Sequence, residues 1–232
     1  MLKLIMPMAG MGSRFETQGY KLSKPMIPVG DVPMFVHAER CIGLDFDERI
    51  FIVRAEQNLR EDILQWYPDA HVVELDSMTE GTACTLLTAA EYYEDGSSIF
   101  VSNCDQHTEW NSEFARSIID NPDVDGLISV FHCPEKDPKW SYAQLNALGD
   151  VERVAEKDPI SEWATTGFYY WRDGKQFIRN ANSMIDANDR VNGEFYTCPV
   201  FNYTCAESRV VTLEVDRMQG IGTPEDLEEF LK

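Results

Sequence analysis

The sequence is short of positive charge and of long apolar runs. Lys and Arg number 20 against 40 Asp and Glu, which gives a formal net charge of −20 over 232 residues. Because phosphate backbones bind to basic surfaces, this balance argues against nucleic acid as a partner. Pro7 and Gly10 interrupt the apolar N-terminus, and no run approaches the roughly 20 residues that a membrane-spanning helix needs. We therefore expect a cytoplasmic protein with no signal peptide and no membrane partner.

The sequence also lacks the spacing of common metal and nucleotide motifs. Its six cysteines include no CxxC pair, so reduced thiols are expected and the spacing gives no support for a zinc site. The segment PMAGMGSRF (7–15) has Phe15 where a GxGxxG fingerprint needs its third glycine, and the chain contains no GK[ST] run. A dinucleotide fingerprint and a P-loop are both excluded.

What is present is an alternation of short apolar segments with amphipathic ones. This pattern predicts βαβ units, and therefore an α/β fold with a Rossmann-like, mainly parallel sheet flanked by helices. The predicted strands are 2–8, 49–55, 70–76, 98–103, 125–132 and 209–216. The predicted helices are 33–44, 58–67, 81–93, 175–189 and a last one capped by Thr223 with Pro224 in its first turn.

The middle of the chain has a different pattern. Residues 140–157 alternate in the manner of a hairpin around Gly149 and Asp150, and 164–171 forms another strand-like run. With no linker-like tract in the sequence, we expect a single domain over 1–232. Its expected parts are a nucleotide-binding core (1–133), a small α+β acceptor-side lobe (134–208) and a closing strand and helix (209–232).

The first 30 residues concentrate positive charge in an otherwise acidic chain. They hold Lys3, Arg14, Lys21 and Lys24 against the single acid Glu16. In an open α/β sheet, ligands bind beyond the carboxyl ends of the strands, which is where this loop is expected. Its glycines allow backbone N–H groups to approach an anion closely, so the segment is a candidate phosphate site.

Five ordered elements resemble the sugar-nucleotidyltransferase family, also called nucleoside-diphosphate-sugar pyrophosphorylases. They are GMGSRF with KPM and PVG (10–30), EGTA (80–83), VSNCDQ (101–106), EK with TGFY (156–169), and NGEFYT with IGTPED (192–226). The resemblance spans nearly the whole chain and implies a GT-A-like nucleotidyltransferase fold. It is greatest to short members from capsule and surface-polysaccharide loci, which include a CTP:phosphoglutamine cytidylyltransferase.

The resemblance also implies an activity and a role for particular residues. Such an enzyme transfers NMP from an NTP to a phosphorylated small-molecule acceptor, releases pyrophosphate and uses Mg²⁺. Arg14 and Lys24 would then be catalytic and Asp105 would bind the metal. The implied nucleotide-binding residues are Ala9, Gly10, Gly12, Ser13, Glu80, Gly81, Thr82 and Asn103, and the implied acceptor-binding residues are Glu156, Lys157, Gly167, Glu194 and Tyr196.

One departure from the family pattern concerns the metal. Larger relatives carry a second metal-binding Asp directly before the hydrophobic-Gly-Thr-Pro element, and this chain has Gly220 there. Either Asp105 holds Mg²⁺ with phosphates and water, or Asp216 replaces the missing ligand. CTP is the favoured nucleotide. A hexose-1-phosphate uridylyl- or thymidylyltransferase, a non-catalytic nucleotide-binding regulator, and homodimer formation are left open.

Overall fold

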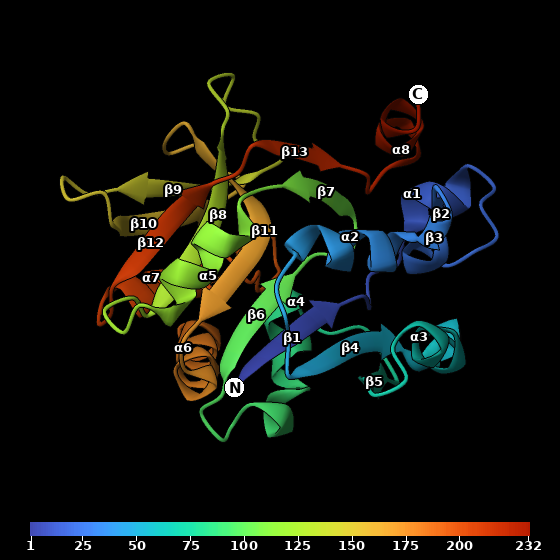
Figure 1. The fold of residues 1–232 in the computed structure, drawn as a ribbon, viewed down its shortest axis with the longest axis horizontal. Coiled ribbons are helices and arrows are strands. Elements are labelled where there is room, and N and C mark those ends of the chain that lie inside the picture. Colours follow the sequence, from blue (N-terminus) through green and yellow to red (C-terminus); the bar gives the residue numbers. More distant parts are fainter.

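The structure is a computed structural model that describes residues 1–232, and it is built on a nine-stranded mixed sheet (Figure 1). Its main path has the order β10-β9-β11-β6-β1-β4-β5, and β8 pairs with β11 and β12. These strands are β1 (Leu2–Pro7), β4 (Glu48–Arg54), β5 (His71–Leu75), β6 (Ser98–Ser102), β8 (Gly126–His132), β9 (Ser141–Leu145), β10 (Val151–Glu156), β11 (Trp163–Trp171) and β12 (Val210–Glu214).

Helices cover both faces of this sheet, as the alternating sequence pattern predicts. They are α1 (Ser13–Thr17), α2 (Met34–Ile42), α3 (Arg60–Trp66), α4 (Thr82–Leu87), α5 (Ser112–Asp120), α6 (Gly174–Asp186), α7 (Val200–Cys205) and α8 (Pro224–Phe230), with 3-10 turns at Lys24–Met26, Ala55–Gln57 and Ala90–Tyr92. β6, β1, β4 and β5 are parallel, whereas β11 runs antiparallel to β6 and β8. The expected α/β fold class is confirmed.

Strand β1 lies at the centre because apolar side chains on both of its faces are buried. Side chains alternate across a strand, so Leu4 and Met6 point to one face and Ile5 to the other. Leu4 and Met6 pack in the clusters under α2, α3 and α5, and Ile5 packs with the residues of α4, α6 and α7. Continuous burial of this kind is typical of a parallel strand covered on both sides.

The middle segment folds back onto the parallel strands as antiparallel structure. The predicted hairpin is β9 and β10, whose turn contains Gly149 with a φ of +84°. The predicted strand at 164–171 is β11, which has a register shift between Thr165 and Tyr169 against β8. Gly167 lies in that bulge with a φ of +97°, so the strand opens beside the end of β6.

The end of the chain returns to the end of β6. Two short strands not predicted from the sequence, β7 (Gln106–Glu109) and β13 (Arg217–Gly220), form an antiparallel ribbon, as do β2 (Pro28–Val29) and β3 (Val32–Pro33). Helix α8 then packs beside α1 through Phe15, Ile221 and Leu227 (Figure 1). None of the helices combines the length and the apolar character that crossing a membrane requires.

Helix α8 is capped as predicted, and this cap is testable. The Thr223 hydroxyl accepts a hydrogen bond from the Asp226 N–H at 3.1 Å and donates to the Asp226 carboxylate at 2.7 Å. Thr223→Ala should therefore lower the free energy of unfolding by about 1 kcal/mol in urea denaturation, whereas Thr223→Ser should retain most of it. Equal losses for the two variants would contradict the capping role.

Candidate active site

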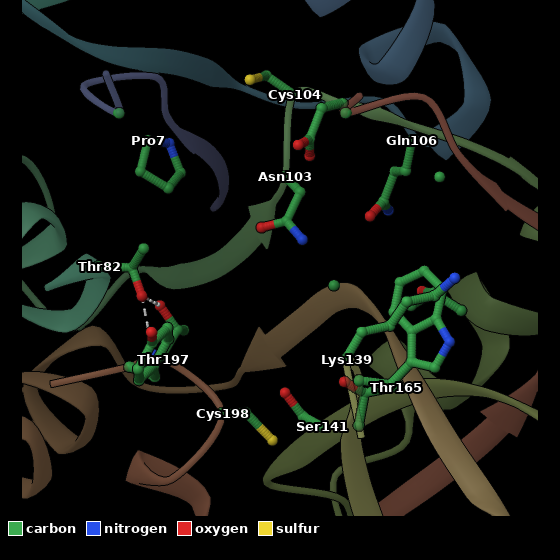
Figure 2. Close-up of a pocket in the computed structure, with 18 of the residues that line it drawn as sticks. Pro7, Thr82, Asn103, Cys104, Gln106, Lys139, Ser141, Thr165, Thr197 and Cys198 are labelled. Atoms are coloured by element: carbon green, nitrogen blue, oxygen red, sulfur yellow. Dashed lines mark hydrogen bonds between the residues drawn. The ribbon is translucent and has the colours of Figure 1, made fainter. Parts of the chain in front are cut away.

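A cavity of about 510 Å³ opens at the carboxyl ends of β1 and β6 (Figure 2). Its position follows the rule that ligands of open α/β sheets bind beyond the carboxyl ends of the strands. Figure 2 shows the side chains of Asn103 and Gln106 directed into this space from the segment that follows β6. The sequence-predicted residues that line it are Gly10, Arg14, Lys24, Thr82, Asn103, Asp105, Glu156, Lys157, Gly167 and Tyr196.

The Lys24 ammonium and the Asp105 carboxylate form an ion pair in the cavity. Lys24 begins a 3-10 turn in the loop after β1, and Asp105 follows β6. Burial acts to lower the pKa of Lys24, but the Asp105 carboxylate more than offsets it, so the pKa lies above its ordinary value. The ammonium therefore stays charged at neutral pH.

The glycine-rich loop leaves one cation free at the cavity mouth. Gly12 begins α1 with a φ of +66°, and a Cβ at this position would lie 3.0 Å from the Cβ of Lys24. Arg14 is exposed, lines the cavity and forms no ion pair. Ala9 is buried and Ser13 is exposed, and neither they nor Gly12 line the cavity.

Cys104 sits between two cavity residues but cannot act as a nucleophile as it stands. Burial raises the pKa of its thiol to about 12, so the sulfur remains protonated near neutral pH. In Figure 2 its sulfur points away from the side chains of Asn103 and Gln106. The cavity therefore offers charge and hydrogen bonds instead of an activated thiolate.

The start of α4 is pinned to the segment at 195–197. Gly81 has a φ of +134°, and a Cβ there would overlap the backbone of Phe195. The Thr82 hydroxyl accepts hydrogen bonds from the N–H and the hydroxyl of Thr197, at 3.0 and 2.9 Å. Gly81 thus allows close backbone packing, and of the residues predicted in this element only Thr82 lines the cavity.

Two other predicted residues lie outside the cavity. Glu80 is exposed and pairs with Arg190 at 2.5 Å, and Glu194 is exposed in the turn that begins at Val191. Neither residue lines the cavity, although the charge of Glu194 acts on Glu156 and helps to raise its pKa.

The far side of the cavity is built from β9, β10 and the segment after α6. The Ser141 hydroxyl donates a hydrogen bond to the Glu156 carboxylate, and burial raises the pKa of Glu156. Lys157 donates to the Tyr196 hydroxyl at 2.5 Å, and its ammonium lies 4.3 Å from the centre of that ring. An ammonium, a carboxyl group and hydroxyl groups are thus presented together.

Gln106 was not predicted, yet it is the most unusual polar residue of the cavity. It is 1% exposed, and neither atom of its side-chain amide has a hydrogen-bond partner. A Cβ at Gly167 would overlap the Asn103 amide and lie 2.8 Å from Gln106 Oε1, so this glycine makes room for both side chains. A buried amide without partners is costly unless a ligand satisfies it. Gln106 is the last residue of the VSNCDQ element, but the resemblance implied no role for it.

Besides Asp105 and Glu156, the carboxylate that lines the cavity is Asp226 and not Asp216. Asp216 is exposed, lies outside the cavity and uses its backbone N–H to bond the carbonyl of Glu109 at 2.8 Å. Asp226 is half-buried in the first turn of α8 and lines the cavity. Its signal in the sequence was its place three residues after the Thr223 cap, which suggested only a helix-capping role.

Basic side chains outnumber acidic ones in the cavity, whereas acidic residues are in excess in the whole chain. Acids outnumber bases two to one overall, whereas four cationic and three acidic side chains line the cavity, namely Arg14, Lys24, Lys139 and Lys157 with Asp105, Glu156 and Asp226. Cations that surround a concave site attract anionic ligands, and a carboxylate among them provides a hard oxygen ligand for a divalent cation. An open α/β sheet with such a site is typical of nucleotide-binding proteins.

The comparisons with known proteins define the family. Residues 3–229 match the family described as Nucleotidyl transferase, so the chain belongs to this family of enzymes. Two curated relatives, both named bifunctional protein GlmU and from two strains of Methanococcus maripaludis, are 28% and 27% identical over 130 residues. The match covers 53% of this chain but only 31% of each relative, so the chain spans about a third of their length.

Solved structures show the same fold over the full chain. A nucleoside-diphosphate-sugar pyrophosphorylase from Vibrio cholerae RC9 superposes with a TM-score of 0.83 at 22% identity, covering 100% of this chain and 99% of that one. A glucose-1-phosphate thymidylyltransferase from Bacillus anthracis, in complex with a sucrose, gives 0.79 at 18% identity, with 100% and 94% coverage. At these identities the likeness establishes the fold.

The half-buried Glu156 predicts a pH-dependent difference in stability. Because its pKa is raised, the folded state keeps this proton to a higher pH than the unfolded state does. The free energy of unfolding is therefore lowered fully above the folded-state pKa, where the charge is buried, and is not lowered below the unfolded value of about 4.3. Glu156→Gln should raise the melting temperature by about 2–4 °C near pH 8, and the gain should vanish towards about pH 4. The exposed Glu152→Gln on the same strand is the matched control. A gain that is constant with pH would refute the burial argument.

Proposed function

We propose that the chain transfers a nucleotidyl group from an NTP, CTP being favoured, to a phosphorylated small-molecule acceptor and releases pyrophosphate. The observation that carries this proposal is the convergence of Arg14, Lys24 and Lys157 with Asp105 in one cavity of an acidic protein. The reaction brings two anions together, so charge neutralisation and alignment are its main demands. The cavity supplies both.

In this mechanism an acceptor phosphate oxygen attacks the α-phosphorus in line with the leaving group. The new bond joins that oxygen to the α-phosphorus, and the bond from the α-phosphorus to its bridging oxygen breaks as pyrophosphate leaves. Arg14 and Lys24 bind the leaving phosphates, and Lys157 positions the attacking phosphate. Because that phosphate is already ionised near neutral pH, no general base is required.

The residues present fit a divalent cation at Asp105. Its carboxylate lies in the cavity among cations, and a Cβ at Gly222 would overlap Oδ2, the oxygen that pairs with Lys24, so glycine makes room for this carboxylate. Asp105 would hold Mg²⁺ together with water and phosphate oxygens, and Asp226, which also lines the cavity, would be the second carboxylate ligand. Bound there, the ion would neutralise charge that develops on the phosphates.

Two parts of the cavity correspond to two substrates. Residues of the β1 loop and the start of α4 would bind the NTP. Glu156, Lys157 and Tyr196, which belong to the acceptor-side lobe expected over residues 134–208, would bind the acceptor together with Gln106, whereas Asn103 would bind the NTP. Because the site holds hydroxyl, carboxyl and amide groups besides Lys157, the acceptor should carry polar groups besides its phosphate. A capsule or surface-polysaccharide precursor, including phosphoglutamine, has this chemistry.

Two alternatives share this cavity. A hexose-1-phosphate uridylyl- or thymidylyltransferase is favoured by the fold neighbour named as a thymidylyltransferase. A non-catalytic nucleotide-binding regulator is favoured by Gly220 in place of an acid. Pyrophosphate release should be measured with CTP, UTP, dTTP and ATP against phosphoglutamine and hexose 1-phosphates. Release with CTP and phosphoglutamine supports the proposal, and metal-dependent NTP binding with no release for any pair supports the regulator.

Lys24→Ala should lower kcat/KM about 10²- to 10³-fold, because the variant loses the ammonium group that we propose binds the leaving phosphates. The cooperative unfolding transition should remain. Lys21→Ala is the matched control, since Lys21 is exposed in the same loop and does not line the cavity. Unchanged turnover in the Lys24 variant with every NTP would disprove the role of this loop.

Gln106→Met should weaken the binding of the acceptor and leave the binding of the NTP unchanged. The substitution keeps an unbranched side chain but removes both amide groups, so kcat/KM for the acceptor should fall about 10- to 100-fold while KM for the NTP stays within about twofold. Thr108→Val is the control, because its hydroxyl is also buried without a partner on β7 but lies outside the cavity. A rise in KM for the NTP instead would assign Gln106 to the nucleotide side.

A further inference from the structure

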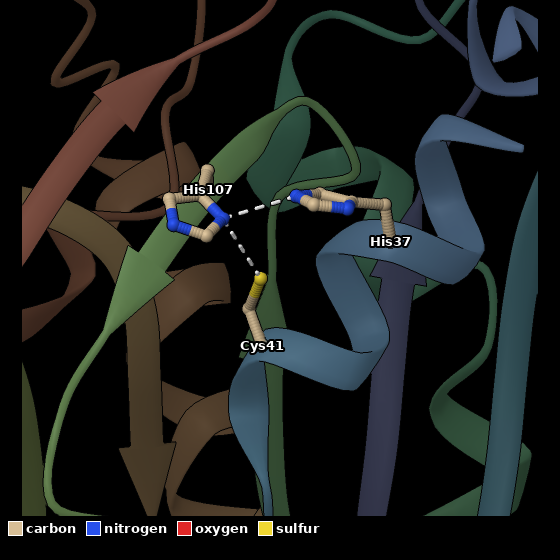
Figure 3. Close-up of side chains that lie close together, drawn as sticks. All are labelled: His37, Cys41 and His107. Atoms are coloured by element: carbon tan, nitrogen blue, oxygen red, sulfur yellow. Dashed lines mark hydrogen bonds between the residues drawn. The ribbon is translucent and has the colours of Figure 1, made fainter. Parts of the chain in front are cut away.

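Three potential metal ligands converge outside the cavity, between α2 and β7 (Figure 3). His37 and Cys41 are four residues apart on α2 and therefore lie on one face of that helix. His107 lies on β7, and Figure 3 shows its ring directed at both of them. All three are half-buried, and one ligand atom from each lies within 4.8 Å of the others.

Two of the three ligand distances in this cluster are close to those of a tetrahedral metal site, and the third is no more than 4.8 Å. His37 Nε2 lies 3.1 Å from His107 Nδ1, and Cys41 Sγ lies 3.6 Å from the same nitrogen. Zn–N bonds near 2.0–2.1 Å and Zn–S bonds near 2.3 Å at tetrahedral angles imply separations of about 3.4 Å for N···N and about 3.6 Å for N···S. At His107 the cluster therefore already has the spacing that a tetrahedral cation requires.

The protonation of His107 directs a lone pair into the cluster. Its Nε2 lies 3.0 Å from Glu109 Oε1, and a carboxylate accepts hydrogen bonds, so in the neutral imidazole Nε2 carries the proton. Nδ1 then has one lone pair, which faces both His37 Nε2 and Cys41 Sγ. His37 Nε2 and Cys41 Sγ thus share one hydrogen-bond acceptor, whereas a bound cation would contact all three side chains. A carboxylate on the outer nitrogen of a ligating histidine is also the usual support of such ligands.

The surroundings complete the site. The ring of Phe230 on α8 lies 5.4 Å from the ring of His37 and 4.8 Å from that of His107, measured between centroids, and so provides an apolar neighbour. Asp105 offers a hard oxygen ligand on the cavity side, whereas this cluster offers two imidazoles and a thiolate. That softer set suits Zn²⁺ and disfavours Mg²⁺.

We propose that His37, Cys41 and His107 form a Zn²⁺ site with a fourth position open to water, separate from the cavity, which pins α2 to β7. The sequence spacing could not indicate it, because His107 is 66 residues from Cys41. The site does not depend on the proposed function, since none of its ligands lines the cavity.

Co²⁺ added to EDTA-treated, reduced protein is the test. One equivalent should bind and give a thiolate-to-cobalt charge-transfer band together with the visible bands of tetrahedral cobalt, and Zn²⁺ should displace it. Excess Mg²⁺ should leave it bound. Absence of the charge-transfer band in the unaltered protein, or displacement by Mg²⁺, overturns the proposal whether or not any variant folds.

Substitutions of the proposed ligands test whether the ion binds at this cluster. Cys41→Ser should abolish the charge-transfer band and weaken Zn²⁺ binding at least 10-fold, and Glu109→Gln should weaken it about 10-fold. Cys84→Ser is the matched control, being another half-buried free cysteine, and should bind like the unaltered protein. If Zn²⁺ affinity is equal in the Cys41 and Cys84 variants, the ion lies elsewhere and the assignment is wrong.

Discussion

The ion pair between Lys24 and Asp105 joins the segments on which the cavity depends. Its ammonium belongs to the loop after β1 and its carboxylate to the segment after β6. The same aspartate accepts a hydrogen bond from Ile221 through its carbonyl at 2.9 Å, and Gly222 packs against its carboxylate. Asp105 thus contacts segments from the start and from the end of the chain. In an acidic protein this ion pair holds the Lys24 ammonium in the cavity, where an anionic ligand would bind.

Much of the fold could be predicted because its strands carry a strong and local signal. Parallel strands buried on both faces are continuously apolar, and each of those in the core lies within two residues of its predicted bounds. The Thr223 cap and the hairpin turn at Gly149 were predictable for the same reason, since each depends on neighbouring residues only. Side chains at the carboxyl ends of β1 and β6, such as Asp105, then follow from topology.

The remaining parts of the site depend on contacts between distant residues, which a local pattern does not encode. The ribbon of β7 and β13 pairs Gln106 with Gly220, and neither segment is long or apolar enough to indicate a strand. This pairing buries Gln106 and carries the chain past the cavity, so that Asp226 enters it and Asp216 does not. Gly81 was predicted to bind nucleotide, but its contact with the Phe195 backbone is a packing requirement that only the folded structure reveals.

Strand β7 has a consequence for how the molecule transmits change. Successive residues of a strand face opposite sides, so Gln106 points into the cavity while His107 faces α2. A strand of four residues has little room to move one of these side chains independently of the other. A ligand in the cavity and a ligand between α2 and β7 would therefore contact the same short strand, and a shift of the β7 backbone would move the side chains at both sites.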